Sequence, residues 1–310
     1  MPVSDEERNK YIAFVGEQIK RLKSLEVDSQ QLIWHYTTGD ALLSIVRSGT
    51  IYATQVACLN DSSEVRYGED LLKQAFLHIQ TKESLPLEEA SFLEQVLKPS
   101  AGDGTTNPTS DWFVSCFSKE KDDLSQWRAY SGGENGYAIG FIVGAFFRPH
   151  NLVVRVNYDE DEHRATAQTI AEATLQFYRE GLQTRSGKEA KSWPTEFLQE
   201  WSIWTGKLAP MVKDPAFHGE KEYRIIHQYQ GFELSKLSFR QKQSLMSLHL
   251  PLVFPPPEWA IQSNRLPIME VMVGPSRHKD ISRVSAELFM RQNGYSNVSV
   301  TISKAPFQTT

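Results

Sequence analysis

Cysteine is scarce in this chain. Only Cys58 and Cys116 occur among its 310 residues. Two thiols cannot build a disulfide framework or a zinc site made of cysteines alone. The acidic, polar opening MPVSDEERNK lacks the charge and apolar pattern of a signal peptide. We therefore expect a cytoplasmic protein in a reducing compartment.

Long apolar runs and an excess of basic charge are also missing. No apolar run approaches the roughly 20 residues that a membrane-spanning helix needs, so no membrane partner is expected. The formal net charge is −5, from 33 basic and 38 acidic residues, which gives nonspecific DNA binding no support. With 40% hydrophobic and 23% charged residues, residues 1–310 are predicted to form one globular domain.

Several common catalytic motifs do not occur. The chain has no GxxxxGK[ST] phosphate loop, no HExxH zinc motif, no GxSxG elbow and no GxGxxG turn after a first strand. Its eight histidines show no metal-ligand spacing, so no metal is expected. These absences leave the unusual polar strands as the features that could carry chemistry.

The hydrophobic pattern predicts a mixture of helices and strands. Ser4 and Glu7 have the spacing of a capping box, followed by apolar residues at helical spacing, so an amphipathic helix is predicted over 5–25. Asp40 is predicted to cap a following helix that Gly49 ends. The pattern further predicts strands at 31–36, 50–54, 112–117, 137–143, 153–158 and 222–229, helices at 41–48, 124–130, 160–184 and 195–208, and a turn at 60–64 that leads into a helix.

Strands and helices do not alternate strictly, so the class is α+β. We predict a split, twisted, mixed sheet with helices around it and a helical insertion over about 160–207. Residues 268–303 are predicted to form a βαβ-like tail. Residues 250–258, LPLVFPPPE, are predicted to be an extended connector because proline removes a backbone donor.

The first polar strand has the sequence Trp34-His35-Tyr36-Thr37. Side chains alternate along a strand, so His35 and Thr37 share one face and the two aromatic residues share the other. An imidazole and a hydroxyl side by side suit hydrogen bonding to a ribose or an amide. The competing interpretation is a core histidine whose ring is satisfied within the protein.

The second polar strand is Glu220-Lys221-Glu222-Tyr223-Arg224. Alternation predicts that Glu220, Glu222 and Arg224 share a face. A carboxylate beside a ribose stabilises an oxocarbenium-like transition state when an N-glycosidic bond breaks. The competing interpretation is a solvated strand face with an internal Glu–Arg pair of small energetic value.

Aromatic residues follow a third strand, which ends in Phe117-Ser118. Trp127 and Tyr130 come three residues apart on the predicted helix that follows. Aromatic rings near a strand end can sandwich a flat heterocycle, or they can simply belong to the core.

Taken together, these segments resemble a large family of bacterial proteins that carries a domain of unknown function. The segments that carry the likeness are His35-Tyr36-Thr37, Asn60-Asp61-Ser62-Ser63-Glu64, Ser115-Cys116-Phe117-Ser118 with Trp127, Gly136 to Phe141, and Glu220 to Arg224. The likeness spans residues 31 to about 230 and implies no activity.

The same segments are remotely similar to ADP-ribosyltransferases of the histidine–tyrosine–glutamate kind. That similarity implies that His35 orients the ribose of NAD with Thr37 beside it, and that Glu222 is the catalytic carboxylate. Glu220 would not be the catalytic carboxylate but would activate the acceptor. Nicotinamide would lie between Phe117 and Tyr130, with Ser118 and Trp127 also at the cofactor, although Tyr137 competes for the stacking position.

The expected function is ADP-ribosyl transfer from NAD, as substrate, to a protein or nucleic-acid acceptor, in a bacterial defence or toxin setting. Two alternatives stay open. Water could be the acceptor, which would make the protein an NAD glycohydrolase. The chain could also be a non-catalytic binding or sensing protein, because a fold does not determine a function.

Overall fold

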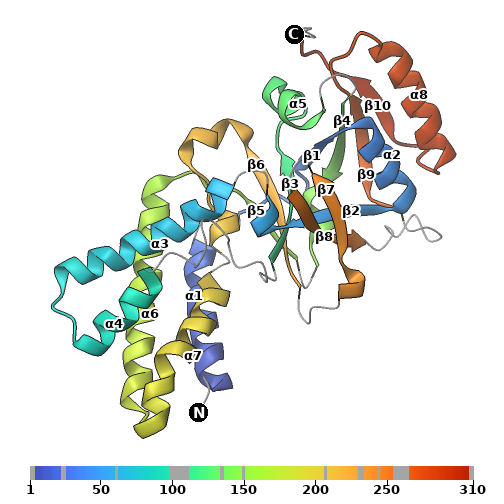
Figure 1. Cartoon of the computed structure of the whole chain (residues 1–310). Coiled ribbons are helices and arrows are strands. Elements are labelled where there is room, and N and C mark those ends of the chain that lie inside the picture. The colour runs from blue at the N-terminus through green and yellow to red at the C-terminus, as the bar shows by residue number, and fades with distance from the viewer. Residues whose placement is uncertain are drawn as a thin grey trace. The chain divides into compact units, whose positions relative to one another are not determined.

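A computed structural model describes residues 4–21, 26–59, 62–97, 112–132, 136–148, 151–205, 208–229, 234–242, 245–253 and 265–306 (Figure 1). The chain forms two compact units. One comprises Met1–Leu25, Val56–Trp112 and Val156–His218, and the other comprises Glu26–Gln55, Phe113–Arg155 and Gly219–Thr310. We call them the helical unit and the sheet unit. That the whole chain is a single domain stays a prediction.

Five α-helices lie in the described part of the helical unit. They are α1 (Asp5–Arg21), α3 (Ser62–Lys82), α4 (Leu87–Leu97), α6 (Glu160–Gln183) and α7 (Gly187–Thr205), joined by the short 3-10 helices η2 (Val56–Cys58), η4 (Ala209–Met211) and η5 (Pro215–Glu220). The segment predicted to be a helical insertion contains α6 and α7, and that it is an insertion stays a prediction. The capping box of Ser4 and Glu7 starts α1 as expected. Aromatic rings fill the core, with Phe92 stacked on Tyr178 at 4.1 Å between centroids.

Ten strands lie in the described part of the sheet unit. They are β1 (Leu32–Thr37), β2 (Thr50–Gln55), β3 (Trp112–Ser118), β4 (Tyr137–Ile142), β5 (Asn151–Arg155), β6 (Glu222–Gln228), β7 (Ser238–Lys242), β8 (Leu245–Val253), β9 (Ile268–Val273) and β10 (Ser299–Ile302). The helices of this unit are α2 (Gly39–Ser48), α5 (Leu124–Tyr130), α8 (Lys279–Gln292), η3 (Val143–Phe146) and η6 (Leu234–Lys236).

The sheet is mixed and branches at β3. Its main path runs β10-β9-β4-β1-β3-β2-β8-β7, and β6 also pairs with β3, with β5 beyond it. Strands β9 and β10 pair in parallel, whereas β1 pairs with β3 and β4, β2 with β3 and β8, β4 with β9, β5 with β6, and β7 with β8 in antiparallel fashion. The predicted class, α+β with a large twisted mixed sheet, is confirmed (Figure 1). Near the C-terminal end of the described residues, α8 connects the parallel strands β9 and β10.

Two apolar clusters cover the two faces of the sheet around β1. Ile33 joins the main core with Phe117 and Tyr223, and α2 contributes Leu42 and Ile45 to it. The other face carries a smaller cluster of Trp34, Tyr36, Trp127, Ala138 and Met272, and α5 supplies its Trp127. Strand alternation therefore decides the surroundings of every β1 side chain.

Two local predictions need correction. The N-cap of α2 is Thr38, whose side chain accepts from the Ala41 N–H, rather than Asp40, which lies inside the helix. Residues 250–253 belong to β8 rather than to a connector. Pro251 is tolerated there because β7 pairs with β8 only as far as His249. Among the described residues, β2 alone pairs with this part of the strand.

Other differences are of extent. The predicted helix 195–208 begins at Gly187, ends at Thr205 and contains Pro194. The strand predicted at 153–158 is β5, at 151–155. Helix α4 and strand β7 were not predicted at all. The start of the turn predicted at 60–64, the end of the helix predicted at 5–25, and residues 254–258 lie outside the described residues.

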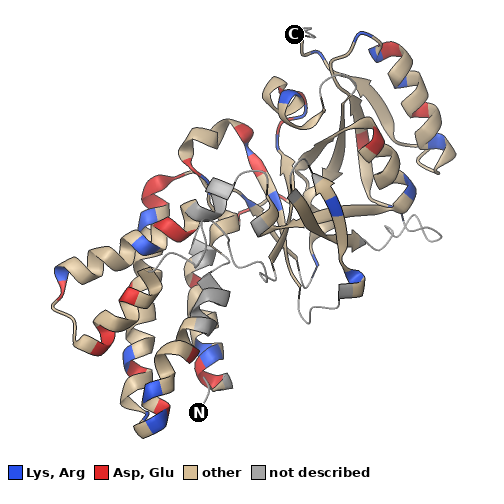
Figure 2. Cartoon of the chain, viewed as in Figure 1, with Lys and Arg blue, Asp and Glu red and all other residues tan. Residues whose placement is uncertain are grey.

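Charged residues of both signs are interspersed along helices such as α6 and α8, and the strands are largely uncharged (Figure 2). Within the described residues, no helix combines the length and apolar character that crossing a bilayer requires.

Candidate functional site

The three polar strands of the sequence meet at one place in the sheet unit. β3 lies between β1 and β6, and Ser118 at its end pairs with Trp34 of β1. On the other side, the Ser118 hydroxyl donates to the Glu220 carbonyl at 2.9 Å, and the Lys119 N–H donates to the Lys221 carbonyl at 3.0 Å. Strands in a sheet are about 4.8 Å apart, so the β1 and β6 backbones are separated here by roughly 10 Å.

His35 is a part-buried residue of β1 with a defined ring orientation. Its Nδ1 lies 3.1 Å from the Cys116 carbonyl oxygen. A carbonyl can only accept, so Nδ1 carries the proton and donates it to this bond. Burial lowers the pKa of His35, so the ring is neutral at pH 7. The Nε2 atom of a neutral ring in this tautomer is an acceptor, as a ribose hydroxyl would require.

The His35 ring contacts Phe117 at 5.5 Å between centroids. Phe117 is 3% exposed, and its ring also packs against Phe146 at 5.1 Å and Phe141 at 6.0 Å. Phe117 is thus a core residue in this structure. Thr37 is buried at the end of the same strand.

Glu222 is the first residue of β6 and is engaged by Arg224. Both carboxylate oxygens accept hydrogen bonds at 2.8 Å, one from Nε and one from Nη2 of the guanidinium. Alternation directs both side chains away from Tyr223 and Ile225, which belong to the same core as Phe117. The structure therefore does not bring the Glu222 carboxylate onto the face where His35 meets Phe117.

Glu220 does not share the strand of Glu222, contrary to the predicted alternation. It ends η5, and β6 begins only at Glu222. Lys221 between them has φ 45°, the only positive φ outside glycine among the described residues. A residue in the left-handed conformation does not continue the extended backbone of a strand. The alternation of side-chain directions that starts at Glu222 therefore does not extend back to Glu220. Backbone strain of this kind is concentrated at functional sites.

The two other predicted aromatic ligands are on α5. Trp127 is 2% exposed and packs on Tyr36 at 4.6 Å, on the face opposite the Phe117 core. Tyr130 is 38% exposed at the end of the helix. Phe117 and Tyr130 therefore do not enclose one space in this structure.

Tyr36 and Asp122 are two residues whose roles the sequence did not reveal. The Tyr36 hydroxyl donates to the Glu120 carbonyl at 2.8 Å and accepts from the Asp123 N–H at 3.1 Å. Asp122 accepts from Trp127 Nε1 at 2.7 Å and from the Lys304 N–H at 2.7 Å. Together they hold the charged loop that follows β3 in place. No sequence spacing marks these contacts, because their partners are mostly backbone atoms.

A surface hollow of about 640 Å³ lies at the end of β1. Tyr137 in its wall pairs with Thr37 across the β1–β4 ladder, so the hollow adjoins the predicted ribose-binding strand. Its lining is rich in hydroxyl groups and includes one imidazole and one carboxylate: Thr38, Gly39, Asp40, Ser131, Gly132, Tyr137, His278 and Ser282. Such groups suit a polar, hydroxyl-bearing ligand.

Metal chemistry is not indicated by the geometry. Among the residues with described positions, no group of three or more His, Cys, Asp or Glu side chains is placed to hold a metal ion.

A family model described as "Protein of unknown function (DUF2971)" matches residues 126–225. The matched segment runs from α5 to the middle of β6, and so includes Trp127, Glu222 and Arg224. The comparisons with curated proteins and with solved structures each found no match.

Proposed function

We propose that the chain transfers ADP-ribose from NAD to a macromolecular acceptor. The observation that carries this proposal is the meeting of the ends of β1, β3 and β6, which places His35 and Glu222 on strands that flank the same neighbour. The neutral His35 ring, the strained Lys221 before Glu222 and the polar hollow at the end of β1 support it.

In this proposal the C1′–N bond of NAD breaks and nicotinamide leaves with the bonding electron pair. His35 Nε2 accepts from a ribose hydroxyl. The Glu222 carboxylate starts on the other face of the sheet, so the proposal requires it to turn past the start of β6 towards C1′, where it stabilises the positive charge that develops. A nucleophile on the acceptor forms the new bond to C1′ and releases its proton, which Glu220 or water takes up. Thr37, Ser118, Trp127 and Tyr130 stay proposed NAD contacts. Phe117 would not contact NAD, but its ring would pack against the His35 ring and hold it in position.

The Glu222–Arg224 pair sets a condition on this chemistry. Both carboxylate oxygens already accept from Arg224, so Glu222 must exchange one of these bonds for a ribose hydroxyl when NAD binds. The same pair favours a second candidate, a binding protein without turnover, in which Glu222 and Arg224 only stabilise β6. Hydrolysis of NAD is the version of the first candidate with water as acceptor.

The test is incubation of the purified full chain with adenylate-labelled NAD in cell lysate. The wild type is compared with Glu222→Gln, His35→Gln and the control Glu172→Gln, which removes an exposed carboxylate on α6. We expect label on a macromolecule with wild type and control, and at least a hundredfold less with either site variant, each shown to be folded at the assay temperature.

Any other result of this experiment either identifies one of the two alternative functions or refutes the roles assigned to His35 and Glu222. Free ADP-ribose without a labelled macromolecule would identify a glycohydrolase. NAD binding without turnover in the wild type would identify the binding protein and refute transfer. Full activity in both site variants would refute the assigned roles of His35 and Glu222.

A further inference from the structure

The helical unit contains a cavity that the proposed reaction does not use. It lies among α1, α6 and α7 and has a volume of about 180 Å³. Four aromatic side chains line it, Tyr11, Phe177, Trp193 and Phe197, together with Gly181, Thr184 and the charged residues Glu7, Arg8, Lys10 and Glu180. Three of the four aromatic side chains are at most 4% exposed and Phe177 is part-buried. Most of the lining surface is apolar.

The Trp193 side chain, which forms one wall of the cavity, is held in place by several contacts. Its Nε1 donates to the Tyr178 carbonyl at 3.1 Å. One face of the indole lies directly on Gly181, where a Cβ would be only 2.1 Å from the ring. The Arg185 guanidinium stacks on Trp193 with its carbon 3.6 Å from the ring centroid. The indole is therefore held on several sides.

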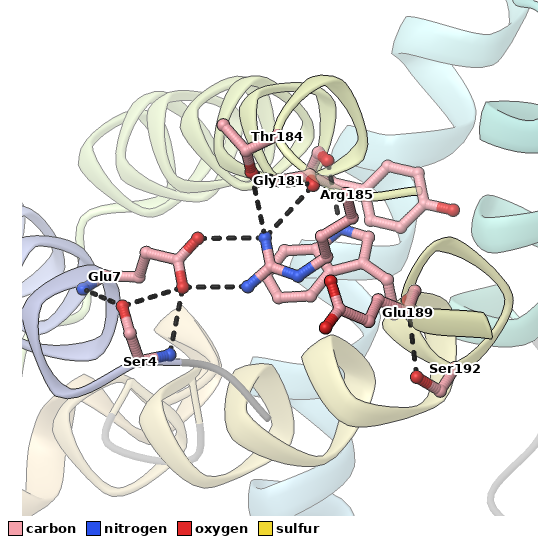
Figure 3. Close-up of polar contacts among 9 residues, drawn as sticks. Ser4, Glu7, Gly181, Thr184, Arg185, Glu189 and Ser192 are labelled. Carbon is pink, nitrogen blue, oxygen red and sulfur yellow. Dashed lines mark hydrogen bonds and ion pairs between the residues drawn. The ribbon is translucent and has the colours of Figure 1, made fainter. Parts of the chain in front are cut away.

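Arg185 is itself held firmly (Figure 3). Its two terminal nitrogens donate to the two oxygens of Glu7 at 2.9 and 2.8 Å, and one of them also donates to the Gly181 carbonyl at 3.0 Å. The Arg185 side chain is 7% exposed. The bonds of Arg185 to Glu7 and to the Gly181 carbonyl connect α1 to the end of α6. They fix the positions of the two helices that line the cavity.

The opposite wall is also anchored. Thr174 donates its hydroxyl proton to the Ile170 carbonyl, so the Tyr11 hydroxyl is the donor in its 2.9 Å bond to Thr174. The Tyr11 ring then packs edge-on against Phe177 at 5.2 Å. Since the polar atoms of Tyr11 and Trp193 bond away from the cavity, the rings present apolar surface to it.

Size and lining together indicate one kind of ligand. An apolar cavity of about 150 Å³ in another protein stays dry and binds benzene. The cavity here is slightly larger, and its aromatic walls offer edge-to-face contacts to a ring. Glu180 and Lys10, which pair at 3.3 Å and are 45% and 66% exposed, lie at its rim and leave room for a polar ring substituent in water.

We propose that this cavity is a binding site for a small molecule with a single six-membered aromatic ring, which would contact the wall formed by Tyr11, Phe177, Trp193 and Phe197. The site is independent of NAD transfer and needs no change at β1, β3 or β6. Its walls are preorganised, so binding costs little conformational entropy.

Fluorobenzene is the probe for the first experiment, followed by its ¹⁹F resonance during titration with the full chain. We expect one saturable site with a Kd on the order of 1 mM or tighter. Phe177→Trp puts a larger ring into the cavity and should weaken binding at least tenfold. Phe147→Trp makes the same change at a side chain that is 44% exposed in the sheet unit, and should leave binding unchanged.

Bromobenzene soaked into crystals of the wild type locates the ligand without any variant. A bromine peak among the four rings supports the proposal even where Phe177→Trp fails to fold. Absence of saturable fluorobenzene binding, undiminished binding in folded Phe177→Trp, or a bromine peak only elsewhere would overturn it.

Discussion

Glu222 and Arg224 form a bidentate ion pair within one strand, with side chains that are only 8% and 1% exposed. Removing two charges from water is expensive, and their mutual attraction offsets that cost only while both partners are present. The pair therefore makes the stability of β6 depend on a carboxylate that the proposed reaction also needs.

Arg224→Met should destabilise the protein strongly, because it leaves the Glu222 carboxylate buried without its guanidinium. We expect a loss of about 3–5 kcal/mol in the free energy of unfolding, measured by urea denaturation. Glu222→Gln keeps a neutral acceptor and should cost about 1–2 kcal/mol. The double variant should lose less than the sum of the two. Strict additivity would show that the two side chains are not coupled.

Gly181→Ala should destabilise the helical unit, because its Cβ would lie 2.1 Å from the clamped Trp193 ring. We expect a cost of about 1–3 kcal/mol from the forced shift of the indole, measured as a lower thermal midpoint. Gly16→Ala is the matched control in α1, where nothing lies within 4 Å of the new Cβ. Alanine is the better helix former, so that variant should gain up to about 1 kcal/mol. Equal effects of the two substitutions would contradict the structure.

Glu7 should make stability depend on pH in the acid range. The hydrogen bonds from Arg185 lower the pKa of Glu7 from 4.5 to about 2, so the folded state favours the ionised carboxylate. The stabilisation is complete above pH 4.5 and is lost as the pH falls towards 2. Its size at pH 7 should be about 1 kcal/mol, because the Glu7 side chain is 36% exposed and screened by solvent.

Urea denaturation of the wild type and Glu7→Gln between pH 7 and pH 2.5 tests this dependence. The stability difference between the two should stay constant down to about pH 5 and shrink below it. Glu172→Gln, at an exposed carboxylate on α6, should show no such change. A difference that is independent of pH would refute the ion pair with Arg185.

Local signals predicted much of the fold. The capping box of Ser4 and Glu7 and the helix 124–130 appear where the sequence predicts them, because caps and apolar periodicity act over a few residues. The prediction at Pro251 was wrong because a proline fits a strand where one side lacks a pairing partner. Pro251 pairs with Tyr52 of β2, and the pairing of β7 with β8 reaches only to His249.

The sequence by itself determined the class of the protein, most element positions and the alternation along β1 and the body of β6. These follow from short-range sterics and from the burial of apolar side chains. Only the tertiary structure decided that Phe117 belongs to the core, that Arg224 occupies both oxygens of Glu222, and that Glu220 lies outside β6. Those outcomes depend on strand pairing and on one left-handed residue, Lys221, and such long-range geometry leaves no mark in the spacing of residues along the chain.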